Sequence, residues 1–267
     1  MRKWLEECED LSEFAEITLV ASDIDGTLTL GDKITAQLVS DISILQDHGI
    51  SLLMVTGRSV GWGQALAGYL PVAGVIAENG GVFVGSGEEP PRPLVDVGDL
   101  RKHRAGLENC YEGLKKHYPH LRETADNLFR LSDWTFGVAG LSAEQLVEMN
   151  ELCRGWGYTF TFSSVHCHIM DPRQDKAAGV ERARAYLPAI IPEKKESMVT
   201  IGDSPNDAPL FDALRFPCSV GVRNCEEYLH LMKHRPKYIS RHAEAAGFSS
   251  LARLLITQKK RVCDTPR

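Results

Sequence analysis

The sequence predicts an α/β protein in which a mainly parallel sheet is interrupted by a smaller α+β unit. Short apolar runs alternate with segments of helical periodicity in both halves of the chain. This order is typical of a parallel sheet with right-handed crossover connections. Between residues 85 and 172 the order changes to one typical of an antiparallel sheet. We therefore expect a core domain of residues 1–84 and 173–267 and an inserted domain of residues 85–172.

The first part of the chain alternates helices with short strands. Its apolar runs are too short for helices and suit buried parallel strands. In order, we expect a packing helix over residues 4–14, a strand over 17–21, a helix from 34 that stops near Gly49, a strand over 51–55, a helix over 60–70 and a strand over 72–77.

The middle of the chain begins with a break. The segment Pro90-Pro91-Arg92-Pro93 ends the alternation. The order that follows is helix, strand, strand, helix, strand, strand, which predicts an antiparallel sheet with two helices. The expected elements are helices over residues 100–118 and 142–153 and strands over 128–131, 134–138, 158–162 and 166–170.

The alternation of strands and helices resumes in the last part of the chain. No sequence repeat relates it to the first part. The expected elements are helices over residues 176–187, 208–214, 225–232 and 243–255 and strands over 198–201, 218–222 and 238–240.

The composition excludes several classes of protein. The chain has 267 residues, of which 43% are hydrophobic and 25% charged, as in globular proteins of one or two domains. A net charge of −6 disfavours a nucleic-acid partner. No apolar run approaches the ~18–20 residues that span a membrane, and residues 1–17 lack a signal peptide's apolar centre. The 7 scattered cysteines predict reduced thiols. We expect a cytoplasmic monomer or homodimer without a membrane partner.

Two carboxylates follow the first predicted strand. Asp23 and Asp25 stand in the segment Asp-Ile-Asp-Gly-Thr, so that one can serve as a nucleophile and the other as an acid or base. Gly26 permits a sharp turn whose backbone N–H groups can meet an anion. The alternative is an ordinary Asp/Gly turn after a strand.

A second acidic cluster follows the strand predicted over residues 198–201. Asp203, Asn206 and Asp207 offer oxygen ligands that suit a hard cation such as Mg²⁺. The same segment reads as the capped start of a helix with Pro205 in its first turn. Both interpretations can hold together.

Single polar residues stand at two further positions of interest. Thr56 ends a strand and can donate its hydroxyl to an anion, with Gly57 and Arg58 next to it. The alternative for Thr56 is a helix cap. Lys176 can place a cation beside a phosphate, although a single lysine is usually a surface residue.

Taken in chain order, these features resemble the four motifs of the haloacid dehalogenase-like (HAD) superfamily. The matched residues lie in a core of about residues 18–84 and 173–250. The segment Ala-Glu-Asn-Gly-Gly at residues 77–81 is similar to the Cof-type branch, subclass IIB. The resemblance implies a Rossmann-like core, an inserted type-2B cap domain and a phosphatase that hydrolyses phosphoric monoesters.

The resemblance also implies a role for each matched residue. Asp23 would attack phosphorus and form an aspartyl phosphate, and Asp25 would protonate the leaving oxygen and then activate water. Mg²⁺ would be held by Asp23, the backbone carbonyl of Asp25 and Asp203, with Asp207 in support. The residues implied to bind or orient the phosphoryl group are Gly26, Thr27, Thr56, Gly57, Lys176 and Asn206.

The substrate is the least determined part of the prediction. We expect a small polar metabolite, such as a sugar phosphate or phosphoglycolate. Alternatives are a phosphomutase of the same superfamily, a signalling receiver and a silent phosphometabolite-binding protein. His166 and His168 point the same way on a strand, but they read as ordinary strand residues rather than metal ligands. Candidate substrate contacts are Arg58, Glu78, Asn79, Arg130, Asp133, Trp134, His166, His168 and Arg173.

Overall fold

The structure is a computed structural model that describes residues 3–8, 10–87 and 89–264, with side chains to residue 261. Its main feature is an eight-stranded sheet in the order β11-β10-β9-β1-β2-β3-β4-β5. Strands β11 to β3 run parallel, and β4 and β5 are antiparallel additions. The strands are β1 (Leu19–Ser22), β2 (Ser51–Val55), β3 (Gly74–Ala77), β4 (Val82–Val84), β5 (Arg92–Pro93), β9 (Met198–Gly202), β10 (Cys218–Gly221) and β11 (Tyr238–Ile239).

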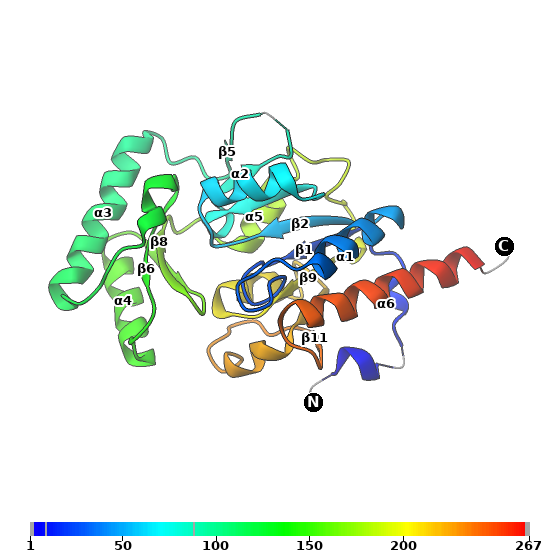
Figure 1. The fold of residues 1–267 in the computed structure, drawn as a ribbon. Helices are drawn as coiled ribbons and strands as arrows, with labels where there is room; N and C mark the ends of the chain where they lie inside the picture. The colour runs from blue at the N-terminus through cyan, green and yellow to red at the C-terminus, as the bar shows by residue number, and fades with distance from the viewer. Residues whose placement is uncertain (1–2, 9, 88, 265–267) are drawn as a thin grey trace.

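Helices cover both faces of this sheet (Figure 1). Successive strand residues point to opposite faces, so Val20 and Leu19 of β1 belong to different apolar clusters. One face packs against α1 (Ala36–Asp47), α2 (Val60–Tyr69) and α6 (Glu244–Asp264). The other face packs against α5 (Lys176–Ala183) and the 3₁₀ helix η6 (Pro205–Phe211). The predicted α/β class is confirmed.

A second, antiparallel sheet has the order β6-β8-β7. Its strands are β6 (Asp133–Gly137), β7 (Thr159–Phe162) and β8 (His166–Met170), and its helices are α3 (Leu100–His117) and α4 (Ala143–Gly155). The two helices share an apolar cluster with this small sheet. The small sheet lies between the two helices and the large sheet (Figure 1). Below, "cap" denotes this unit and "core" the unit of the large sheet.

The predicted domain boundaries at residues 84 and 173 stay a prediction. Strand β5 lies beyond the first of them, yet it pairs with β4 in the large sheet. We propose that the chain leaves the core after β5 rather than before it.

Two predicted elements near the ends of the units are wrong. The expected helix over residues 4–14 is replaced by the 3₁₀ turns Leu5–Glu7 and Ser12–Phe14, because Trp4 forms a bridge with Ile239 at the sheet edge. The expected strand over residues 128–131 is also wrong, since a 3₁₀ turn covers Ala125–Phe129. Its apolar side chains face solvent, with Leu128 88% exposed.

Two predicted helices of the last part are 3₁₀ turns instead. The segment expected as a helix over residues 208–214 lies largely in η6, where Pro209 lacks the N–H that an α-helix needs. The helix expected over 225–232 is replaced by the end of the 3₁₀ turn η7 (Arg223–Glu227) and by turns over residues 228–231. The helix expected over 176–187 ends at Ala183, and the last helix extends to Asp264.

Two predictions from composition concern the cysteines and the membrane. The described cysteine side chains, from Cys8 to Cys225, are thiols rather than disulfides, and that of Cys263 lies outside the described residues. Among the described residues, no helix combines the length and the apolar character needed to cross a membrane.

Candidate active site

The carboxyl ends of four parallel strands meet at one edge of the large sheet. Strands β3, β2, β1 and β9 are successive neighbours, so the residues that follow them lie close together. Asp23, Thr56, Glu78 and Asp203 come directly after these strands, and all four are buried. This edge therefore gathers the polar clusters that the sequence places after separate strands.

The loop after β1 is shaped by Gly26. Its φ of +81° is unfavourable for other residues, and a Cβ there would lie 2.6 Å from Oδ2 of Asp203. Thr27 donates its hydroxyl to Oδ1 of Asp203 at 3.2 Å. Asn224 donates to the carbonyl of Gly26 at 3.0 Å and to Oδ2 of Asp203 at 2.9 Å. The loops after β1 and β9 are thus held against each other.

Lys176 joins two buried carboxylates. It is the first residue of α5, and its Nζ lies 2.5 Å from Oδ1 of Asp23 and 2.6 Å from Oδ1 of Asp207. Burial works to lower the pKa of Lys176, but Asp207 and Asp23 together raise it. The ammonium group is therefore held charged beside Asp23.

The acidic triad Asp23, Asp203 and Asp207 is the place where a metal would bind. One ligand atom of each lies within 4.8 Å of the others, and all three residues are buried. Burial raises the pKa of Asp23 to about 7, although Lys176 opposes the rise. Burial also raises the pKa of Asp203, with Asp23 adding to the effect. A set of buried carboxylate oxygens that is costly to ionise fits a hard divalent cation.

Asp207 also organises its own loop. Its Oδ2 accepts hydrogen bonds from the backbone N–H groups of Asp203 at 2.9 Å and Ser204 at 3.0 Å. Glycine is required at position 202, since the Cβ of any other residue there would lie 2.5 Å from Cγ of Asp207. The capped-turn interpretation of this segment is therefore right, and it holds together with the cluster of carboxylates.

Asp25 is paired with Arg58. Both of its oxygens accept hydrogen bonds from the guanidinium, at 2.8 Å from Nε and 2.6 Å from Nη2. The guanidinium also lies over the ring of Trp62 at 5.1 Å. The backbone N–H of Arg58 donates to the hydroxyl of Thr56 at 3.0 Å. The N-cap of α2 is Ser59, so Thr56 closes a local turn and is not a helix cap. Asp25 and Arg58 are about one-fifth and one-quarter exposed, unlike the buried triad.

Glu78 fastens the cap segment to the core. Its buried carboxylate accepts from the backbone N–H groups of Val60 and Leu131 at 3.0 Å and from the N–H and hydroxyl of Ser132 at 2.6 and 2.8 Å. Burial raises the pKa of Glu78. With its oxygens fully engaged, Glu78 connects the two units and is not one of the residues that line the cavities described below.

Replacement of Glu78 by alanine is expected to destabilise the fold. Several buried donors would lose their acceptor, and the expected loss in free energy of unfolding is about 3 kcal/mol. Urea unfolding followed by circular dichroism measures this loss. Glu151→Ala, at an exposed site of α4, is the control. A Glu78→Ala protein as stable as the control would contradict the anchoring role.

A charged network is buried at the cap side of the site. Arg130 donates to both oxygens of Asp133, at 2.9 and 3.0 Å, and to the carbonyl of Gly57 at 2.9 Å. Nδ1 of His168 lies 2.9 Å from Oδ2 of Asp133. Burial lowers the pKa of His168. Burial works to raise the pKa of Asp133, but Arg130 and His168 together lower it. The network ties the cap to the loop after β2.

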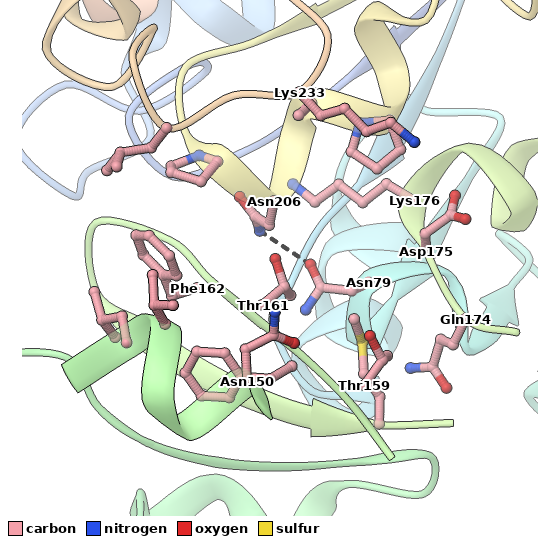
Figure 2. A pocket seen from close by; sticks show the side chains of 18 of the residues that line it. Asn79, Asn150, Thr159, Thr161, Phe162, Gln174, Asp175, Lys176, Asn206 and Lys233 are labelled. Atoms are coloured by element: carbon pink, nitrogen blue, oxygen red, sulfur yellow. Dashed lines mark hydrogen bonds between the residues drawn. The ribbon is translucent and has the colours of Figure 1, made fainter. Parts of the chain in front are cut away.

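Two cavities lie where cap and core meet. The smaller, about 20 Å³, is bordered by Asp23 and Asp25 on the core side and by His166 and His168 on the cap side. The larger, about 520 Å³, contains Asn79, Lys176 and Asn206 in its wall. Figure 2 shows this larger cavity, with Nδ2 of Asn206 donating to Oδ1 of Asn79 at 2.9 Å. Asn206 borders both cavities.

Comparison with known proteins decides the family. Residues 20–89 match a family model described as haloacid dehalogenase-like hydrolase. A phosphoglycolate phosphatase of Saccharolobus solfataricus is 31% identical over 238 residues, which cover 86% of this chain and 92% of that protein. This chain belongs to the haloacid dehalogenase-like hydrolases.

Other relatives agree with this membership. A phosphoglycolate phosphatase of Methanothrix thermoacetophila is 27% identical over 237 residues, covering 88% of this chain and 95% of that protein. The trehalose-6-phosphate phosphatase C-terminal domain of C. albicans has the same fold, with a TM-score of 0.70 at 15% identity and coverage of 96% and 98%. The predicted HAD superfamily, its Cof-type subclass IIB and the phosphatase class are confirmed.

The site of this hydrolase brings together most of the residues predicted for it. One edge of the sheet holds the acidic triad together with Lys176, Asp25, Thr56, Gly57 and Asn206. Some predicted substrate contacts lie elsewhere. Trp134 packs against Tyr111 and Arg104 in the cap, and Arg173 pairs with Asp171 in an exposed position. Neither borders the two cavities.

Sequence reasoning missed three kinds of contribution to the HAD hydrolase site. Asn224 holds two loops together but belongs to no strand-end motif. Ser163 and Val165 border the smaller cavity from the turn between β7 and β8, which the sequence marks only as a turn. Gln174 lies in the wall of the larger cavity just before α5. The proximity of Gln174 to Lys176 in the chain is the one signal that pointed to it.

Proposed function

We propose that this hydrolase is a Mg²⁺-dependent phosphomonoesterase that acts through an aspartyl phosphate on Asp23. Its substrate is a small polar metabolite, such as a sugar phosphate or phosphoglycolate. The observation that carries the proposal is the juxtaposition of Asp23 with Lys176, Asp203 and Asp207 at the end of β1. The names of the two curated relatives support a phosphomonoester substrate.

The first step needs a carboxylate to approach a phosphate dianion. Lys176, fixed 2.5 Å from Oδ1 of Asp23, offsets the repulsion between them. Oδ of Asp23 forms a bond to phosphorus, and the bond from phosphorus to the ester oxygen breaks. Asp25 gives that oxygen a proton, so the rest of the substrate leaves as an alcohol.

The second step returns the enzyme to its starting state. Asp25 takes a proton from water, whose oxygen attacks phosphorus and displaces the carboxylate of Asp23. Inorganic phosphate is released. Because Arg58 engages both oxygens of Asp25, this pairing must open for Asp25 to reach the ester oxygen or the water.

Mg²⁺ would be held by Asp23 and Asp203, with Asp207 in support. When bound, it supplies positive charge next to the transferring phosphoryl group. The burial of three carboxylates in one cluster supports a cation at this position.

Chelation is expected to abolish phosphate release. Treatment with EDTA should lower the rate of phosphate release from a panel of phosphomonoesters by roughly 100-fold or more, and added Mg²⁺ should restore it. The panel includes 2-phosphoglycolate, hexose phosphates and p-nitrophenyl phosphate. Turnover that is unchanged in EDTA would refute metal dependence, and no turnover of any ester would refute the phosphomonoesterase.

A further inference from the structure

The larger cavity lies beside the catalytic carboxylates rather than among them. The 20 Å³ space that touches Asp23 and Asp25 holds about one water molecule. The neighbouring space has about 520 Å³, which is within the usual range for small-molecule sites. Figure 2 shows its cap residues Asn150, Thr159 and Thr161 on one side and core residues on the other.

Three amide side chains leave buried atoms without a hydrogen-bond partner in this wall. The atoms are Nδ2 of Asn79, Oδ1 of Asn150 and Oε1 of Gln174. Asn79 and Gln174 are 1% and 2% exposed. Unpaired buried polar atoms are rare in folded proteins, and three that border one cavity point to a bound group.

The orientation of two of these amides is set by their other ends. Oδ1 of Asn79 accepts from Asn206, which leaves the Nδ2 donor free. Nε2 of Gln174 donates to the carbonyl of Glu78, which leaves the Oε1 acceptor free. With Oδ1 of Asn150, the wall offers one donor and two acceptors at separate positions.

The rest of the lining is partly aromatic and partly polar, and it includes the exposed charged side chains of Arg154 and Lys233 and the half-buried Asp175. Phe160 and Phe162 of β7 contribute ring surfaces, and Thr159 and Thr161 contribute hydroxyl groups. The buried cation of the wall, Lys176, is already shared between two carboxylates. A ligand with several hydroxyl groups and an apolar C–H surface matches the two unpaired acceptors and the ring surfaces of this lining.

We propose that this cavity binds a sugar ring, as the hydroxyl-bearing part of a phosphate ester whose phosphoryl group reaches Asp23. The inference rests on the proposed function and names its substrate class. Lys176 connects the two spaces, because it lines the larger cavity while its Nζ lies 2.5 Å from Oδ1 of Asp23. Asn206 borders both spaces. The volume of about 520 Å³ and the two unpaired acceptors favour a sugar phosphate over two-carbon phosphoglycolate, which has no hydroxyl group to donate.

The ratio of kcat/KM for two substrates tests this choice. Phosphate release is measured with glucose 6-phosphate and 2-phosphoglycolate for the natural protein, Asn150→Ala and the control Asn109→Ala, at an exposed position of cap helix α3. We expect the natural protein to favour glucose 6-phosphate by at least about tenfold. Asn150→Ala should lower that ratio roughly 3- to 10-fold, and the control should not. Preference for 2-phosphoglycolate, or a ratio that Asn150→Ala leaves unchanged, would overturn the proposal.

A binding measurement separates this inference from the proposed function. Isothermal titration of glucose 6-phosphate into Asp23→Asn and Asp23→Asn/Asn150→Ala proteins reports binding without turnover. Weaker binding in the double variant supports the sugar site even if no ester is hydrolysed, in which case only the phosphatase proposal fails. Hydrolysis of esters together with equal binding by both variants overturns the sugar site alone. Melting curves of both variants confirm that they are folded.

Discussion

Asp23→Asn protein is expected to release phosphate at least about 1,000-fold more slowly than the natural protein. The amide is nearly the same size as the carboxylate, so the loop after β1 keeps its shape. It is a poor nucleophile, however, and cannot form the acyl phosphate. Phosphate release with Mg²⁺ and saturating substrate measures the loss.

The matched control changes a carboxylate that has no place in the reaction. Asp47→Asn alters an exposed residue at the end of α1 and should leave the rate within about twofold. A slow Asp23→Asn protein that also melts at a much lower temperature would indicate a folding defect. An Asp23→Asn protein with the natural rate would show that another residue attacks phosphorus.

Lys176→Met protein is expected to lose about 3–5 kcal/mol in free energy of unfolding, because two buried carboxylates lose their shared cation. The side chain is fully buried, so the flexible apolar replacement fills similar space. Lys116→Met, at an exposed site of α3, is the matched control. Urea unfolding in EDTA measures both proteins, and equal midpoints would contradict the role of the pair.

The same carboxylates predict how stability depends on pH. The pKa of Asp23 rises from about 3.8 to about 7 on folding. The stability contributed by its protonated form is complete below pH 4 and is lost as the pH rises through 7. In EDTA the natural protein should therefore become less stable as the pH rises from about 4 to about 7. Mg²⁺ should weaken this dependence on pH, because a bound cation favours the ionised carboxylate. A free energy of unfolding that increases with pH in EDTA would contradict the raised pKa of Asp23.

The edge of the sheet that gathers the polar clusters could be predicted because each part of it is local in sequence. Asp23, Thr56 and Asp203 directly follow short apolar strands, and neighbouring parallel strands bring their carboxyl ends together without further information. Lys176 could be assigned only through the resemblance to the family, since a single lysine carries no signal of burial.

Contacts between distant segments were beyond the reach of the sequence pattern. The carboxylate of Glu78 meets backbone donors more than fifty positions away, at Leu131 and Ser132. Backbone donors carry no sequence signature, so the sequence predicted Glu78 to contact the substrate. The pairing of Arg58 with Asp25 likewise depends on how two loops are placed by the sheet.

Apolar patterns were misleading where tertiary contacts determined the local structure. Leu128 and Phe129 suggested a strand, yet both are mostly exposed, so their hydrophobicity reports no core. Trp4 and Leu5 suggested a helix, but the edge of β11 offers this segment backbone partners that favour an extended start. In both segments, contacts with residues that are distant in the sequence determine the local structure, and the local apolar pattern does not contain them.

Chemical trapping of the intermediate tests the central claim most directly. The natural protein is mixed with substrate and Mg²⁺, quenched during turnover and treated with borohydride, which reduces an acyl phosphate to an alcohol. Peptide mass spectrometry then locates the reduced side chain. We expect homoserine at position 23 and unmodified Asp25. Turnover that leaves Asp23 unmodified, or modification at another carboxylate, would contradict nucleophilic attack by Asp23.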